Sequence, residues 1–356
     1  MVLKNSDQRH SDEPALSDEP ELRRLQLLGC AMKNADIGQL VENCSEGALH
    51  RLLQLSAANK ISLLLCEKLC NTARPESIRA FCGAQLRRNA AHTVISQQLS
   101  ELASKAHVDL LFIKTIRPYL YVGSDIDVIL PSDEEFIGFV EMLGARGYRV
   151  LAKTNHEATL EMNLNGEQYL VDVHNDISAA GTVYFDKQLL WKNTAKADVQ
   201  GHKVHIPSPE AELVLLATHT VFKELSVTLA DFLHAVHLIS QADWEEVSAI
   251  VCTQDLAVAF SAFVSAACAI NTLLYNSPLG HPPLHSGALL PKERRINRFV
   301  NRDFSRKATA PYRYSPLIVA LAYADKFRNN PKELFNARMS RHALTVFYRH
   351  LHGSGG

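Results

Sequence analysis

The sequence predicts an α+β fold, with a short mixed or antiparallel sheet and its helices in the middle of the chain and helical regions on both sides. Two observations lead to this class. Before residue 107 and after residue 206, apolar residues recur at three- and four-residue intervals, which is typical of helices. Between these limits, short apolar runs are bounded by turn-forming residues, which is typical of strands. The 356 residues, 47% of them hydrophobic, suffice for two or three domains.

The chain begins with an acidic segment. Residues 1–20 contain five acidic residues and two prolines, and they lack the apolar core of a signal sequence. We therefore expect a flexible tail there. Residues 21–106 follow as an N-terminal helical region, in which Pro75 and Gly83 interrupt the helical spacing of apolar residues.

The central region, residues 107–206, contains the most informative motif. Residues 121–130 read Tyr-Val-Gly-Ser-Asp-Ile-Asp-Val-Ile-Leu, a buried-strand pattern interrupted by two acids. Side chains two apart on a strand share one face, so Asp125 and Asp127 are expected to point the same way. Two adjacent carboxylates repel each other unless a cation is present, and oxygen ligands suit Mg²⁺ or Mn²⁺. The strand therefore predicts a divalent-metal site of the phosphoryl- or nucleotidyl-transfer type.

A second strand strengthens this prediction, because an isolated Asp-x-Asp is a weak signal that also occurs in turns and loops. Asn165-Gly166 is a strong hairpin signal, so residues 158–164 and 167–173 are expected to pair as antiparallel strands. Asp172 then lies on a second apolar strand. Three carboxylates can bridge two metals about 4 Å apart. We expect the first two acids to bind both metals, and Asp172 to bind the metal at the attacking hydroxyl and to act there as general base.

Four elements follow one another in this region: the Asp-x-Asp strand, a helix over residues 133–146, a Gly-Tyr strand, and the strand that carries Asp172. This order resembles the nucleotidyltransferases of the DNA-polymerase-beta superfamily, particularly its small bacterial and archaeal, uncharacterised branch. The resemblance covers residues 105–195 well and the following helices loosely. It implies a polymerase-beta-type core that moves a nucleoside monophosphate from an NTP to an acceptor hydroxyl and releases pyrophosphate.

The phosphate-binding motif departs from the family. A Gly-Ser pair usually precedes Asp-x-Asp by about a dozen residues in this superfamily, whereas here Gly123-Ser124 adjoins it. Lys114-Thr115 stands at the expected position and resembles a Lys-Gly variant, with Thr in place of Gly. The resemblance implies that Lys114 or Thr115 contacts the triphosphate, although a lysine at a strand end is often merely solvated. Ser124 either bonds a phosphate oxygen or caps a turn; His174 either orients a carboxylate or binds the nucleotide.

Residues 207–352 are expected to form a C-terminal helical domain with a basic surface. Helices at residues 211–224 and 227–240 resemble a helix pair that closes over the nucleotide in the family. Lys223 is then expected to bind the triphosphate, and Asp231 to anchor Lys223 or the helix packing. The alternative is an ordinary amphipathic helix whose polar residues face water.

Basic residues concentrate near the end of the chain. From residue 292 onward there are 14 Lys or Arg residues and four acids, although the net charge of the whole chain is −1. Aromatic residues are interleaved with them: Phe299, Phe304, Tyr312, Tyr314, Phe327, Phe335, Phe347 and Tyr348. Such a mixture can bind RNA through phosphates and stacking. RNA is therefore one expected acceptor, and a small molecule or a protein hydroxyl is the alternative.

Two further features bear on location. Residues 256–275 carry no charge, but their Ala, Ser and Asn271 favour a buried helix over a membrane span. Seven cysteines without a signal sequence indicate reduced thiols and a cytoplasmic protein. No pattern specifies an oligomeric state.

The expected function is a Mg²⁺- or Mn²⁺-dependent nucleotidyltransferase that uses an NTP. The displaced Gly-Ser motif leaves a second possibility, a catalytically lapsed nucleotide-binding or protein-interaction module on the same fold. A phosphohydrolase built on the same acids is a third, but such sites usually include several histidine ligands, and His174 is the histidine near these acids in the sequence.

Overall fold

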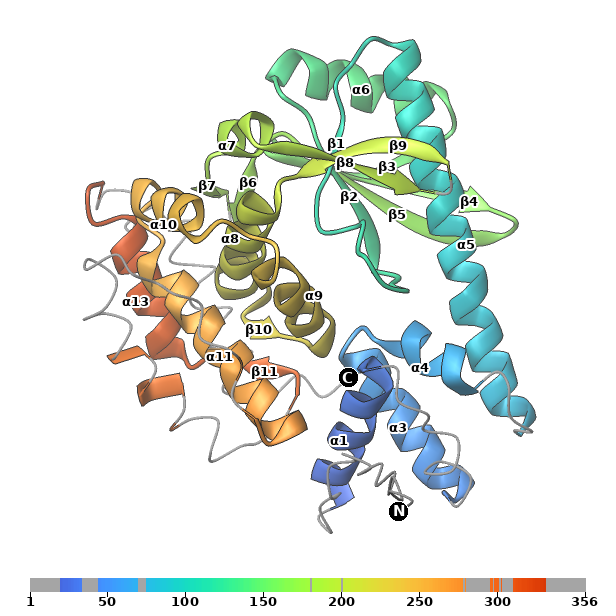
Figure 1. Cartoon of the computed structure of the whole chain (residues 1–356). Coiled ribbons are helices and arrows are strands. Elements are labelled where there is room, and N and C mark those ends of the chain that lie inside the picture. The colour runs from blue at the N-terminus through green and yellow to red at the C-terminus, as the bar shows by residue number, and fades with distance from the viewer. Residues whose placement is uncertain are drawn as a thin grey trace, which may run out of the picture.

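The structure, a computed structural model, describes residues 20–33, 44–69, 75–179, 181–199, 201–277, 279, 295–296, 298–300, 302 and 310–330. Figure 1 shows N-terminal helices at the bottom, a sheet with flanking helices at the top, and C-terminal helices at the lower left. The α+β class predicted from the sequence is confirmed. Residues 1–19 of the predicted acidic tail lie outside the described residues.

The N-terminal region is helical, as its periodicity predicts. Its helices are α1 (Pro20–Met32), α3 (Glu46–Ala58), α4 (Ser62–Leu69) and α5 (Glu76–Lys105). The 30-residue α5 belongs to two cores. Ile78 and Cys82 pack in the core that the other N-terminal helices share with the C-terminal helices, whereas Ile95 and Leu99 pack against the sheet. The helix thus joins the two parts of the chain (Figure 1), and the domain boundary expected at residue 106 stays a prediction.

Seven strands form the central sheet, in the order β3-β4-β5-β2-β1-β9-β8. They are β1 (Leu111–Phe112), β2 (Asp125–Ile129), β3 (Arg149–Lys153), β4 (Glu157–Leu164), β5 (Glu167–His174), β8 (Thr194–Val199) and β9 (His202–Pro207). The predicted hairpin is confirmed: β4 and β5 pair antiparallel through a turn in which Asn165 and Gly166 have φ values of 56° and 85°. β5 then lies parallel to β2. Strand β9 pairs with both β8 and β1.

The two faces of β2 pack against different parts of the molecule. Ile126 and Val128 lie in the core formed with α5 and with α6 (Asp133–Ala145). Ile129, on the opposite face, packs in the core of the C-terminal helices. Because side chains alternate along a strand, the two acids of β2 share the face of Ile129. They therefore point toward the C-terminal helices.

The remaining elements are β6 (Ile177–Ala179), β7 (Thr182–Phe185), α7 (Lys187–Lys192), α8 (Pro209–His219), η1 (Thr220–Glu224), β10 (Ser226–Val227), α9 (Leu229–Ile239), α10 (Trp244–Thr253), α11 (Ala257–Tyr275), β11 (Tyr312–Arg313) and α13 (Pro316–Lys326). One prediction needs correction here. The helix expected over residues 211–224 ends at His219, and the π-helical turn η1 follows it. The wider π turn changes the direction of the side chains after His219, and such turns are frequent at functional sites.

Helix α11 is long and apolar enough to span a membrane by length and composition, with a mean hydropathy of 1.9. However, 83% of its most apolar window is buried inside the protein, where it packs between α8 and α13. It is the core helix that its sequence predicts.

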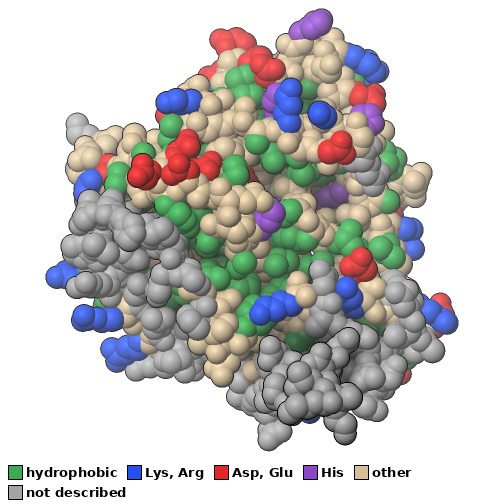
Figure 2. All heavy atoms as spheres, in the orientation of Figure 1, with side chains coloured by type: hydrophobic (Ala, Val, Ile, Leu, Met, Phe, Trp, Pro, Cys, Tyr) green, Lys and Arg blue, Asp and Glu red, His purple; other side chains and the backbone are tan. Residues whose placement is uncertain are grey.

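The described part of the basic C-terminal region does not present the expected aromatic surface. Tyr312, Tyr314 and Phe327 are buried, with 2%, 0% and 6% of their surface exposed, because β11 and α13 complete the apolar core of the C-terminal helices. Phe299 is 45% exposed. Phe304, Phe335, Phe347 and Tyr348 lie outside the described part, as do all of residues 331–352. On the face drawn in Figure 2, the described Lys and Arg side chains are scattered and form no continuous patch.

Candidate active site

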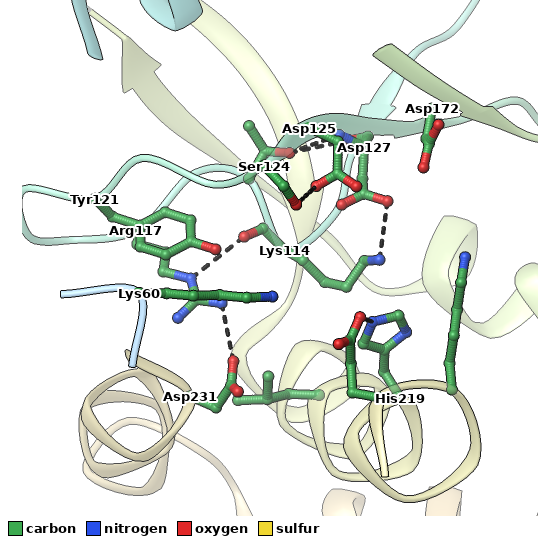
Figure 3. A pocket seen from close by; sticks show the side chains of 14 residues that line it. Lys60, Lys114, Arg117, Tyr121, Ser124, Asp125, Asp127, Asp172, His219 and Asp231 are labelled. Carbon is green, nitrogen blue, oxygen red and sulfur yellow. Dashed lines mark hydrogen bonds and ion pairs between the residues drawn. The ribbon is translucent and has the colours of Figure 1, made fainter. Parts of the chain in front are cut away.

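The three predicted acids meet on two adjacent parallel strands. Asp127 of β2 stands directly opposite Asp172 of β5 in the strand register. Asp125 lies two residues before Asp127 and on the same face. Figure 3 shows the three carboxylates along the top of a pocket, with side chains from the N-terminal and C-terminal helices below them.

Asp127 is the most strongly paired of the three acids. Lys114 Nζ donates a hydrogen bond to its Oδ1 over 2.9 Å, and His174 Nε2 lies 2.8 Å from the same oxygen. Burial alone would raise the pKa of Asp127, but the Lys114 ammonium and the bond from His174 outweigh it and hold the pKa well below its usual range. Asp127 is therefore a carboxylate at any working pH. Both bonds end on Oδ1, which leaves Oδ2 available as a ligand.

Asp172 has the opposite environment. Its Oδ1 atom is buried and has no hydrogen-bond partner in the described part of the chain. A buried carboxylate oxygen without a donor is costly, which points to a missing cation or proton at this position. Among the described residues, Asp127, Asp172 and His174 have ligand atoms within 4.8 Å of one another. This group includes two of the predicted metal ligands and adds a histidine that was not predicted as one.

Asp125 lies outside that close group but within the pocket. Burial raises the pKa of its carboxyl group, and the neighbouring charge of Asp127 raises it further. Ser124 Oγ donates a hydrogen bond of 3.0 Å to Asp125 Oδ1. Two like charges without a full set of cationic partners fit a site that gains a cation when it works.

The predicted phosphate-binding residues surround the acids. Lys114, whose backbone has a φ of 58°, is oriented by a hydrogen bond from its N–H to Glu212 Oε1 of α8. The hydroxyl of Thr115 accepts a hydrogen bond of 2.8 Å from the backbone N–H of Asp127, so it supports β2 from the adjacent segment. The structure thus shows Lys114, Thr115 and Ser124 each in contact with one of the two acids of β2; their contact with a phosphate stays a prediction.

Lys223 is connected to the acids by Glu157, a residue that was not predicted to belong to the site. Lys223 Nζ donates a hydrogen bond of 3.1 Å to Glu157 Oε2, and His174 Nδ1 lies 3.6 Å from the same oxygen. Glu157 therefore connects Lys223 to the histidine that contacts Asp127. The predicted hairpin contained the signal, because counting back from Asn165-Gly166 places Glu157 directly opposite His174.

Asp231 does not anchor Lys223, which was one of its two expected roles. It accepts a hydrogen bond of 3.2 Å from Arg117 Nη2 and closes a capping box with Thr228 at the start of α9. Arg117 is 3% exposed and also lies over the ring of Tyr121, 3.9 Å from its centroid. The other expectation for Asp231, a role in helix packing, agrees with this geometry.

A histidine-glutamate pair closes the floor of the pocket. His219 Nε2 lies 3.3 Å from Glu224 Oε1, and His219 Nδ1 lies 3.1 Å from the hydroxyl of Tyr184. Burial lowers the pKa of His219 to about 4, and the hydrogen bond from His219 lowers that of Glu224 to about 2. At neutral pH, Glu224 is therefore an anion and His219 is neutral.

All seven predicted catalytic and nucleotide-binding residues line one pocket, although they come from four separate segments: Lys114, Thr115, Ser124, Asp125, Asp127, Asp172 and Lys223. The pocket also contains residues that sequence reasoning missed or left without a role in the site: Lys60, Arg117, Tyr121 and Glu224. Lys60 comes from the turn between α3 and α4, far from the sheet in sequence. No local pattern marks it.

Two acids on one strand lie beside a single acid on a parallel strand, which belongs to a hairpin. This arrangement defines the class of the protein, a molecule with a nucleotidyltransferase-type core. A family model described as uncharacterised nucleotidyltransferase matches residues 45–269. This range is more than half of the chain, and the chain belongs to that family. No curated protein gives a significant match.

Two solved structures show distant likeness. One is the solution structure of the antibiotic-resistance factor ANT(2'')-Ia, with 15% identity, a TM-score of 0.34, and coverage of 46% of this chain and 91% of that chain. The other is an antigenic nucleotidyltransferase-like protein from Paracoccidioides brasiliensis, with 13% identity, a TM-score of 0.32, and coverage of 48% and 91%. Both TM-scores are too low to inform the site of this chain.

Proposed function

We propose that this protein transfers a nucleoside monophosphate from an NTP to an acceptor hydroxyl and releases pyrophosphate, with a divalent cation held by Asp127, Asp172 and Asp125. One observation supports this function in addition to the family membership. Directly opposite Asp127, on the face that lines the pocket, Asp172 Oδ1 is buried and has no hydrogen-bond partner among the described residues. A carboxylate in this position destabilises the folded protein unless a bound cation or a proton neutralises its charge.

The residues present fit such a cation. Oxygen ligands suit Mg²⁺ or Mn²⁺. The bonds from Lys114 and His174 both end on Asp127 Oδ1, and Asp172 Oδ1 has no partner in the described part of the chain. If the ion is Mn²⁺, which accepts imidazole more readily than Mg²⁺ does, His174 Nε2 would bind the ion in place of Asp127 Oδ1 and complete the close group. When bound, the cation would neutralise charge on the phosphates and lower the pKa of the attacking hydroxyl.

The protein's own groups would divide the remaining work. Asp172 accepts the proton of the acceptor hydroxyl as the new bond to the α-phosphorus forms and the bond to the bridging oxygen of pyrophosphate breaks. Lys114 and His174 fix the orientation of Asp127 by binding its Oδ1. Lys223, which Glu157 binds at the pocket wall, would contact a phosphate oxygen.

The acceptor is not specified by these contacts. RNA remains a prediction, since most of the basic region lies outside the described residues and three of its aromatic residues are buried. A small-molecule or protein hydroxyl is the alternative. A cytoplasmic location likewise stays a prediction from the cysteine content.

The proposal is tested by incubating the full chain with each α-labelled NTP, Mg²⁺ or Mn²⁺, and separate RNA, protein and metabolite fractions. We expect label in one fraction and stoichiometric pyrophosphate, and the labelled fraction identifies the acceptor. Asp172→Asn and Asp127→Asn are each expected to reduce the rate by at least about 1,000-fold, since each removes a group that acts on the transition state.

Asp109→Asn is the matched control, because Asp109 is exposed and lies outside the pocket. It makes the same chemical change and is expected to retain the wild-type rate. Full activity in Asp172→Asn would falsify the assignment. NTP binding that needs Mg²⁺ but releases no pyrophosphate would instead identify a nucleotide-binding module on the same fold.

A further inference from the structure

The N-terminal helices contribute a lysine to the pocket of the catalytic core. Lys60 lies in the turn between α3 and α4, and its side chain lines the same pocket as Asp125, Asp127 and Asp172. Figure 3 shows Lys60 entering from the side opposite the acids, beside Arg117, with its ammonium group directed into the pocket. The family match begins at residue 45, so this turn is part of the unit that the family shares.

The backbone holds Lys60 in place. Its φ of 56° is in the left-handed region, which is unfavourable for a residue with a Cβ atom. Asn59, which is fully buried, secures the turn: its Nδ2 donates to the carbonyl of Ala310 over 3.0 Å, and its Oδ1 accepts from the N–H of Leu229 over 3.1 Å. The N–H of Ala230 also donates to the Asn59 carbonyl over 3.1 Å. A strained conformation that is fixed from several sides is typical of a functional position.

Lys60 differs from the other cations of the pocket. Lys114 pairs with Asp127, Arg117 with Asp231, and Lys223 with Glu157. Lys60 has no ion pair within 4.0 Å and no side-chain hydrogen bond in the described part of the chain, so its three N–H donors are available to a ligand.

Lys60 is also kept charged. Burial alone would lower its pKa, but the charges of Glu224, Asp231 and Asp125, together with Tyr121, outweigh that effect and raise it. An unpaired ammonium group opposite a cluster of acids suits an anion that binds together with cations. A polyphosphate that carries a divalent cation is such a ligand.

We propose that Lys60 forms a subsite for the β- and γ-phosphates of the NTP, and hence for the pyrophosphate product. The proposal rests on the proposed function and adds to it that the N-terminal helices form part of the substrate site. Lys60 would bind the leaving group on the side of the pocket opposite the metal-binding acids. Nucleotide binding would therefore depend on how α3 and α4 dock on the core.

The test is calorimetric titration of the full chain with three probes in Mg²⁺: a non-hydrolysable NTP, pyrophosphate and the corresponding NMP. Lys60→Met keeps the length and apolar stem of the side chain and leaves the backbone conformation equally demanding. It is expected to weaken binding of the NTP analogue and of pyrophosphate at least tenfold and to leave NMP affinity unchanged. Lys60→Arg, which retains the charge, should restore most of the loss.

Lys68→Met is the control variant, because Lys68 lies on α4 and does not line the pocket. It should bind all three probes as the wild type does. Unfolding curves of each variant check that the N-terminal helices remain docked. Equal loss of NMP and pyrophosphate affinity, or no loss of either, would overturn the Lys60 proposal while leaving the proposed function intact; no binding of the NTP analogue or pyrophosphate to the wild type would instead reject the proposed function.

Discussion

At the scale of single residues, Asp127 and Asp172 lie side by side on adjacent strands, but their hydrogen-bonding environments differ. Asp127 is 9% exposed at its side chain and paired with Lys114, which is 11% exposed. Asp172 Oδ1 is buried, and no described residue donates a hydrogen bond to it. Removal of a paired buried carboxylate leaves the charge of its partner buried without a counter-ion, which lowers the free energy of unfolding. A buried carboxylate without a partner itself destabilises the folded state. The two acids should therefore affect activity alike and stability differently.

Asp127→Asn is expected to lower the free energy of unfolding by about 3 kcal/mol, since it leaves the Lys114 ammonium buried without its acid. Asp172→Asn is expected to leave that free energy unchanged or to raise it. Urea denaturation followed by circular dichroism, without divalent metal, measures both changes. Equal losses in the two variants would show that Asp172 has a partner that stabilises the fold.

At the scale of elements, α5 carries a histidine into the core that it forms with the sheet. His92 is 6% exposed, its ring meets that of Tyr169 edge-on at a centroid distance of 5.9 Å, and its Nε2 has no partner in the described part of the chain. Burial, with a smaller effect of the Arg88 charge, lowers the pKa of His92 to about 4. The docking of α5 on the sheet therefore depends on a neutral imidazole.

The stability of the protein should fall in mild acid for this reason. The unfolded chain binds a proton at His92 near pH 6.5, whereas the folded chain resists it until about pH 4. The stabilisation is complete above pH 6.5 and is lost progressively as the pH falls to about 4, by on the order of 3 kcal/mol. Urea unfolding between pH 7 and pH 4 measures it. His92→Gln should reduce the slope, and His202→Gln, at an exposed position of β9, should not.

The hairpin of β4 and β5 leads to a second expectation at this scale. Glu157 at the start of β4 binds Lys223 and approaches His174. Glu157→Gln should misorient His174 and weaken Mn²⁺ binding by about tenfold to 100-fold, as the loss of groups that orient metal ligands usually does. Electron paramagnetic resonance of bound Mn²⁺ measures the affinity. Glu161→Gln on the same strand, where Glu161 pairs with Arg149, is the matched control; an equal effect there would exclude a specific role for Glu157.

At the scale of the whole molecule, the residues of the pocket that follow from local sequence rules could be predicted, and those that depend on the docking of distant elements could not. Asp125, Asp127 and Asp172 could be predicted because strand alternation and the Asn165-Gly166 turn are local rules. The hairpin register even contained Glu157, opposite His174. Lys60 could not be predicted, because its role depends on how two helices dock on the core. The break between α8 and η1 could not be predicted either, because no Gly or Pro marks it in the sequence.

That docking gives the last prediction, which concerns Asn59. Its side chain joins the α3–α4 turn to the start of α9 and to Ala310, and it is fully buried. Asn59→Ala leaves the N–H of Leu229 and the carbonyl of Ala310 without these partners, and should lower the free energy of unfolding by about 2 to 4 kcal/mol. Because the turn also positions Lys60, Asn59→Ala should weaken pyrophosphate binding too, whereas Lys60→Met should weaken binding with little change in stability. Urea denaturation and pyrophosphate titration of both variants separate these effects. If Asn59→Ala lost stability but bound pyrophosphate as the wild type does, the docking of the N-terminal helices would matter for folding and not for the substrate site.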